Sequence, residues 1–204
     1  MTVYLHKNDL PNDLKLEGDL AIDTEAMGLV NRRDRLCIVQ LSNGNSDAHL
    51  VQFQRDKYEA PNLKKLLGNQ ETVKLFHFAR FDVAIIKYYL DVLITNIYCT
   101  RTASKLIRTY TDKHGLKELC KEMLGKDISK QQQSSDWGSY NLTNEQMEYA
   151  AGDVLYLHQL RNLLDPILIR EGRKELAKAC FDFISTRALL DIAGWEEVDI
   201  FAHQ

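Results

Sequence analysis

Two carboxylates, Asp23 and Glu25, follow the short apolar run of residues 20–22 and are separated by a single residue. Alternate side chains of a β-strand share a face, so a strand here would project both carboxylates to the same side. Two like charges about 4 Å apart repel by about 4 kcal/mol at an effective dielectric constant of about 20, so the pair calls for a cation. The pattern therefore indicates a cation-binding site, with a surface turn or strand edge as the alternative.

A third carboxylate, Asp82, ends the segment of residues 77–82. This segment lies where a predicted strand at residues 73–76 gives way to a predicted helix at about 81–90. A carboxylate near the start of a helix is favoured by the helix dipole. Asp82 is thus a candidate metal ligand, and an N-terminal helix cap is the alternative.

Tyr149 and Asp153 are four residues apart in a predicted helix. Residues at this spacing lie on one helical face, about 6 Å apart at Cβ, so the phenol and the carboxylate would share one space. The small residues Ala150, Ala151 and Gly152 between them leave room for another element to approach. The alternative is a half-buried tyrosine beside a solvated aspartate.

Taken together, the order, spacing and contexts of these three segments resemble the DEDD superfamily of 3′→5′ exonucleases. The resemblance spans about residues 20–164 and includes residues 133–137 and 142–143, which look like the segment before the third motif in ribonuclease D. Glu148 occupies the place of a histidine in the other subgroup, so the tyrosine subgroup is favoured. Phe78 replaces the usual asparagine of the second motif, which favours the ribonuclease D branch over polymerase proofreading domains.

The resemblance implies an α/β protein of ribonuclease H-like fold, with a central mixed sheet flanked by helices and a helical C-terminal half. It implies two divalent metal ions, Mg²⁺ or Mn²⁺, which suit four hard oxygen ligands. Asp23 would bridge both ions, Glu25 and Asp153 would complete the first site, and Asp82 would serve the second. Tyr149 would orient the attacking water and help to accept its proton, and the products would be nucleoside 5′-monophosphates.

Candidate substrate contacts lie beside these motifs. Gly28 and Leu29 follow the first motif, and in related enzymes an apolar residue here wedges against the terminal base. A turn is the alternative for the glycine. Trp137 is a further candidate, with a place in the core as its alternative. The other candidates for base or phosphate contacts are His77, Phe78, Arg80, His114 and Lys130.

The elements that must position these side chains follow from the hydrophobic pattern. Strands are expected at residues 20–23, 36–41, 48–51 and 73–76, and a helix begins at Pro61. Helices are expected at residues 81–90, 100–109, 114–124 and 145–164, the last with a Thr143–Gln146 capping box. We expect a single domain over residues 1–204, with its core at about 18–165. An extension at about 167–204 would hold one amphipathic helix with apolar positions Leu176, Cys180, Phe183, Ile184 and Leu190.

Composition limits the class of protein. Hydrophobic residues make up 45% of the 204, enough for a sizeable core without disulfides. The four cysteines are scattered, so no paired metal or redox site is indicated. There is no secretory signal pattern and no apolar stretch near the roughly 20 residues of a membrane span. We therefore expect a soluble, intracellular, cytoplasmic protein without membrane contact.

The charge balance favours a short substrate. The formal net charge is −3, whereas proteins that bind long duplexes carry a strong basic surplus. Residues 101–130 hold eight basic and four acidic side chains, a local surplus of four. This surplus favours a phosphate-facing surface, with a solvated helical face as the alternative.

Ribonuclease D proper carries further helical domains after the catalytic one, and the chain ends about fifty residues after Asp153, so none is expected here. A stand-alone catalytic domain resembles the nanoRNase C family, bacterial enzymes that degrade very short oligoribonucleotides, notably dinucleotides. That family assembles into ring-shaped octamers, so the resemblance implies a homo-oligomer. The terminal helix would then support an interface, with packing on its own domain as the alternative.

Three other functions stay open. A ribonuclease D-like enzyme would trim the 3′ ends of longer RNA or of DNA. A non-catalytic nucleic-acid-binding scaffold would have lost metal ligands, and here every ligand position is filled. A metal phosphatase would leave Tyr149 and the second motif unexplained.

Overall fold

The computed structural model describes residues 1–129 and 131–203 and contains a six-stranded sheet in the order β1-β4-β3-β2-β5-β6. β3 pairs with β2 and β4 in antiparallel fashion, and the other three pairs are parallel. This mixed sheet confirms the predicted α/β class. The strands are β1 Val3–Lys7, β2 Leu20–Ala26, β3 Leu36–Ser42, β4 Ala48–Gln52, β5 Lys74–Phe76 and β6 Ile97–Cys99.

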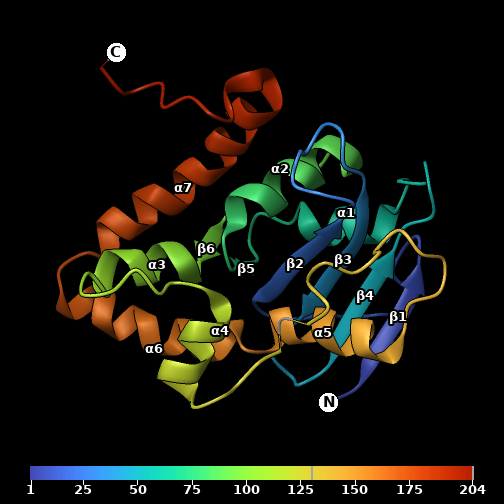
Figure 1. Cartoon of the computed structure of the whole chain (residues 1–204), viewed down its shortest axis with the longest axis horizontal. Helices are drawn as coiled ribbons and strands as arrows, with labels where there is room; N and C mark the ends of the chain where they lie inside the picture. Colours follow the sequence, from blue (N-terminus) through green and yellow to red (C-terminus); the bar gives the residue numbers. More distant parts are fainter. Residues whose placement is uncertain (130, 204) are drawn as a thin grey trace.

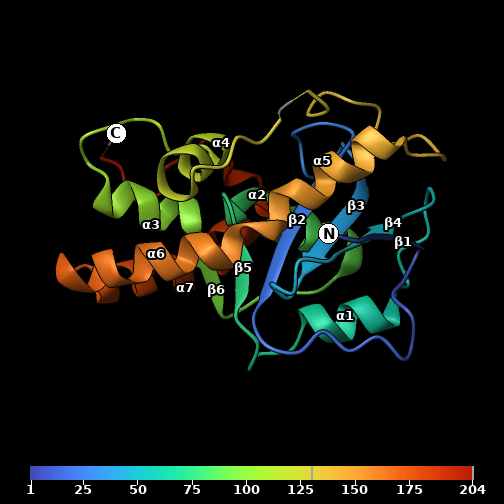
Figure 2. The same cartoon turned by 90° about the horizontal axis from the view of Figure 1, so that it is seen from below.

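Helices cover both faces of the sheet and form most of the second half of the chain. Figure 2 shows α5 along one face of the sheet and α1 along the other. α5 packs against β1 to β4, and α2 packs against β2 and β3. The helices are α1 Pro61–Leu67, α2 Ala79–Leu90, α3 Thr100–Ile107, α4 Leu116–Leu119, α5 Asn144–Leu155, α6 Leu157–Arg170 and α7 Lys174–Leu190, with π-helical turns η1 Cys120–Leu124 and η2 Asp191–Trp195.

Two hydrophobic clusters hold these layers together. The larger cluster joins the sheet to α1, α2, α3, α6 and α7, with members from Leu10 to Ala188. The smaller cluster lies between the sheet and α5 and contains Ile38, Leu50, Trp137 and Ala150. The site described below lies on the α5 side of β2, next to the smaller cluster.

The structure differs from the sequence prediction at several elements. It adds the outer strands β1 and β6 and divides the predicted helix of residues 145–164 at Tyr156 into α5 and α6. The predicted C-terminal helix is present as α7, but Leu176 is exposed while Ala177 and Phe181 are buried, so its buried face is rotated from the predicted one. Among the described helices, none combines the length and apolar character that crossing a membrane requires.

Candidate active site

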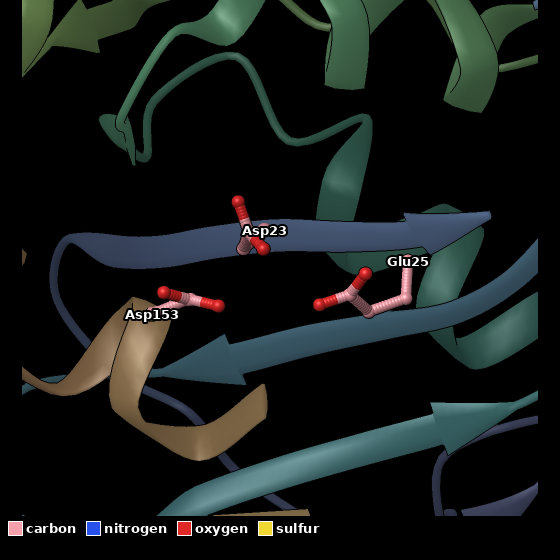
Figure 3. A group of neighbouring side chains, drawn as sticks. All are labelled: Asp23, Glu25 and Asp153. Carbon is pink, nitrogen blue, oxygen red and sulfur yellow. The ribbon is translucent and has the colours of Figure 1, made fainter. Parts of the chain in front are cut away.

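Three carboxylates converge between β2 and α5. One oxygen from each of Asp23, Glu25 and Asp153 lies within 4.8 Å of the others. Figure 3 shows the Glu25 and Asp153 carboxylates pointing toward one another, with Asp23 beside them on β2. Side chains 130 positions apart in the sequence thus form one acidic group, as the sequence predicts.

Local structure explains this convergence. Asp23 and Glu25 alternate on β2 opposite Gln40 and Ile38 of β3, which places them on the side that α5 covers. A register shift between Glu25 and Ala26 then ends the regular pairing. On α5, the fully buried Ala150 and Ala151 let the helix approach the sheet closely.

Asp82 is the fourth carboxylate and lies in the first turn of α2. It is 4% exposed, and its Oδ1 accepts a 2.6 Å hydrogen bond from the Thr24 hydroxyl. Thr24 stands between the two acids of β2, so this bond ties the start of α2 to the acidic strand. The sequence analysis gave Thr24 no role, although a hydroxyl inside an acid–x–acid motif is a usable signal.

The carboxylates raise one another's pKa. Burial raises the pKa of Asp23 well above its usual range, and repulsion from Asp82, Asp153 and Glu25 adds to the effect. Burial, then repulsion from Asp153 and Asp82, does the same for Glu25. Burial also raises the pKa of Asp82 to about 7, against the lowering effect of the Thr24 hydrogen bond. A cluster of this kind is stable in ionised form only with compensating cations.

The donor set fits divalent cations. It consists of carboxylate oxygens alone, the hard ligands that Mg²⁺ and Mn²⁺ prefer. Cations bound there would remove the repulsion that raises these pKa values.

Tyr149 adds a phenol to the same space. Burial and then the neighbouring Asp153, Glu25 and Asp23 raise its pKa, so the hydroxyl stays protonated and can donate a hydrogen bond. Its ring lies 5.9 Å from that of Trp137, centre to centre. Trp137 is 2% exposed and belongs to the core cluster under α5, so it supports Tyr149 from inside.

The loop after β2 presents Leu29 to solvent. Leu29 is 85% exposed, and its contact with a nucleotide base stays a prediction. The Asp34 carboxylate accepts a 2.9 Å hydrogen bond from the Val30 amide and packs so close to Gly28 that a Cβ there would lie 2.2 Å from its Oδ2. A side chain at Gly28 would therefore displace this loop, and the sequence analysis did not single out Asp34.

Phe78 is also exposed and stands at the entrance to α2. It caps the helix in a left-handed conformation, with φ of 72°, which is unusual for an aromatic residue. The Arg101 guanidinium lies 4.6 Å from the centre of its ring. Such residues persist where the surroundings impose them, often at functional sites.

Three of the other predicted substrate contacts have partners within the protein. His77 Nδ1 is 2.9 Å from the Thr100 hydroxyl, and the buried His114 is 2.9 Å from the Ser104 hydroxyl. Arg80 forms an ion pair with Asp191. Lys130 lies outside the described residues, and contact of any of these four with substrate stays a prediction.

This fold and acidic site define a class of nuclease, and the chain matches the 3′-5′ exonuclease family model over residues 6–169. The chain therefore belongs to the 3′-5′ exonuclease family and is an exonuclease of ribonuclease D type. Members of this family use divalent metal ions, in agreement with the acidic cluster.

Several solved structures match over the whole chain, and two of them bear on the site. Brucella melitensis NrnC with bound Mg²⁺ is 50% identical, with a TM-score of 0.96 and 100% of both chains covered. The same Brucella protein bound to pGG is 51% identical over all of both chains, with a TM-score of 0.97.

Curated relatives are longer. Ribonuclease D of Gluconacetobacter diazotrophicus is 33% identical over 160 residues, which are 78% of this chain and 40% of the relative. This chain thus spans less than half the length of the ribonuclease D sequences that it matches. The Escherichia coli ribonuclease D structure, 22% identical with a TM-score of 0.73, shares the fold.

Proposed function

We propose that this exonuclease hydrolyses short oligoribonucleotides, dinucleotides above all, from the 3′ end to nucleoside 5′-monophosphates. The observation that carries the proposal is the 51% identity, over the full length of both chains, with the NrnC that binds the two-nucleotide ligand pGG. The net charge of −3 supports it, because a substrate with few phosphates needs no long basic surface.

In this proposal Asp23, Glu25, Asp82 and Asp153 would hold two divalent cations. When bound, such cations activate a water molecule and stabilise charge on the leaving 3′-oxygen. The Thr24 hydroxyl holds the Asp82 carboxylate in place.

Tyr149 and Leu29 act on the substrate side of the proposed site. The protonated phenol of Tyr149 orients the attacking water and takes part in moving its proton. The exposed Leu29 stacks against the 3′-terminal base. Gly28 and Phe78 would also contact that base. The Trp137 ring packs on the Tyr149 ring and keeps it in position.

The test is a timed digestion of labelled RNAs of two to seven nucleotides with Mn²⁺. We expect the two-mer to be cleaved fastest and nucleoside monophosphate, not inorganic phosphate, to be released. Equal or faster cleavage of the seven-mer contradicts the dinucleotide preference. Asp153→Asn and addition of EDTA should each abolish hydrolysis, and undiminished activity in either would refute the metal-dependent scheme.

A second candidate is trimming of longer RNA or DNA 3′ ends. The 33% identity to a ribonuclease D over 160 residues favours it. The same digestion decides between the two, since a trimming enzyme shortens the seven-mer stepwise and does not favour the two-mer. A non-catalytic scaffold would leave every substrate intact.

We also propose that the protein forms a homo-oligomer, and we expect a ring-shaped octamer. We propose the cytoplasm, where short RNA fragments arise, as its location. Large apolar side chains are exposed at the C-terminal end, where a second copy could cover them: Trp195, Val198, Ile200 and Phe201. Sedimentation analysis of the purified chain tests the assembly, and a monomer at micromolar concentration contradicts it.

A further inference from the structure

The C-terminal segment lies beyond the part of the chain that the family model matches, yet it packs on the helix that carries Asp82. The match ends at residue 169, whereas α7 and η2 cover residues 174–195. Both pack against α2, the helix whose first turn carries Asp82. Figure 1 shows α7 running past α2 toward the C-terminus.

Asp191 is the centre of this contact. Its side chain is 5% exposed and lies between two guanidinium groups. Arg80 donates from Nε at 2.7 Å and from Nη2 at 2.8 Å, a bidentate pair. Arg187, one turn earlier, donates from Nη2 at 2.6 Å. Such charge-assisted, two-point bonds fix orientation as well as distance.

The Asp191 bonds bear on the active site because Arg80 is two residues before Asp82. Arg80 also donates a 2.6 Å hydrogen bond to the backbone oxygen of Glu196. Two of its three side-chain nitrogens are therefore used to hold the C-terminal segment. This arrangement gives Arg80 a structural task, and its predicted contact with a base or phosphate stays a prediction.

A second contact reaches the loop that carries Leu29. Arg32 Nη2 lies 3.3 Å from Glu196 Oε1, with side chains 45% and 41% exposed. An exposed pair of this kind contributes little to stability. It does connect the C-terminal segment to the loop, since Arg32 is only three residues from Leu29.

We infer that the C-terminal segment is a positioning element of the active site, with Asp191 as the positioning residue for the Asp82 turn and Glu196 as that for the Leu29 loop. The inference rests on the proposed function, in which Asp82 holds a cation and Leu29 contacts the base. Catalytic groups must be held within about 0.5 Å of their productive geometry. The separation of 111 residues between Arg80 and Asp191 means that this support comes from outside the catalytic motifs.

The experiment uses the full chain and three variants. Asp191→Asn keeps the shape of the side chain and removes its charge, and Glu196→Gln does the same at the exposed contact. Asp182→Asn is the matched control, because Asp182 on α7 forms an exposed pair with Lys178 of the same helix. Each is compared with the wild type by hydrogen exchange without metal and by kinetics on the two-mer with Mn²⁺.

Hydrogen exchange and kinetics together separate a positioning role from a general loss of stability. We expect Asp191→Asn to speed exchange selectively at residues 79–82 and to lower kcat by about 10- to 100-fold, the effect of a small misplacement of a catalytic group. We expect Glu196→Gln to raise KM with kcat unchanged, and Asp182→Asn to match the wild type.

Uniformly faster exchange along the chain, or equal loss in the control, overturns the inference. If Asp191→Asn does not fold, Glu196→Gln still decides, since an unchanged KM there contradicts a role for the segment. If the wild type leaves the two-mer intact, the proposed function fails, while the exchange at residues 79–82 still reports whether Asp191 positions that turn.

Discussion

Tyr149 is the residue whose task is most open to a direct test. Its phenol remains protonated among three carboxylates and packs on Trp137, so Tyr149→Phe keeps the ring and removes only the hydroxyl. We expect kcat to fall by about 100-fold with KM nearly unchanged, because the lost group acts on water and not on substrate affinity. Tyr88→Phe on the exposed side of α2 is the control. A parallel rise in KM would assign Tyr149 to substrate binding.

The raised pKa of Asp82 makes a prediction about stability without metal. A carboxyl group whose pKa is raised on folding contributes stability below its unfolded pKa and loses it as pH rises through the folded value, here about 7. The free energy of unfolding of the metal-free wild type should therefore fall as pH rises from about 4 to 8. Asp82→Asn cannot ionise, yet an asparagine can still accept the Thr24 hydrogen bond.

The free energy of unfolding of Asp82→Asn should therefore increase relative to that of the wild type as pH rises. At pH 8 the difference in favour of the variant should be at least about 1 kcal/mol. Urea unfolding in EDTA at pH 5 and 8 measures this difference. Adding Mn²⁺ at pH 8 should stabilise the wild type more than the variant. If the variant and the wild type differ in free energy of unfolding by the same amount at both pH values, ionisation of the buried Asp82 does not destabilise the metal-free protein.

At the scale of elements, α5 depends on its N-terminal cap. Thr143 Oγ1 accepts from the Gln146 amide at 3.2 Å, and the Gln146 side chain accepts from the Thr143 amide at 2.9 Å. Thr143→Ala should lower the free energy of unfolding by about 1 kcal/mol, whereas Thr143→Ser should not. Because packing on the sheet still holds α5, activity at 25 °C should persist. If Thr143→Ala loses activity without losing stability, the cap has a role in the active site and this prediction is wrong.

Elements with strong local signals were predictable from the sequence. Pro61 begins α1, the capping box begins α5, and apolar runs mark β2, β3 and β4. β1 and β6 were missed for physical reasons. β1 is a half-exposed outer strand whose side chains include His6 and Lys7, and β6 has only three residues. The break at Tyr156 between α5 and α6 carries no glycine or proline to announce it.

The site shows the same limit. Carboxylates and a tyrosine at motif spacing can be identified in the sequence, because their chemistry is unusual for a core. Thr24 and Asp191 act through contacts whose partners no spacing rule names. Thr24 reaches Asp82 across 58 residues, and Asp191 reaches Arg80 across 111. Such pairs depend on tertiary packing, which only the folded structure supplies.

At the scale of the whole molecule, the charge balance predicts how binding responds to salt. For single strands the logarithm of affinity falls with the logarithm of salt concentration, with a slope of about −0.7 per neutralised phosphate. A two-nucleotide substrate carries about two phosphates, so its slope should not exceed about 1.4 in magnitude. A chain of net charge −3 offers no long basic surface to add to this value.

We therefore expect KM for the two-mer to rise by at most about sevenfold between about 50 and 200 mM salt. KM for the seven-mer should follow nearly the same slope, because only its terminal nucleotides would be held. Initial rates at a fixed Mn²⁺ concentration measure both. A slope near −4 for the affinity of the seven-mer, seen as a rise in KM, would mean that about six phosphates are neutralised. That result would require a binding track across the surface and would favour trimming of longer RNA over cleavage of dinucleotides.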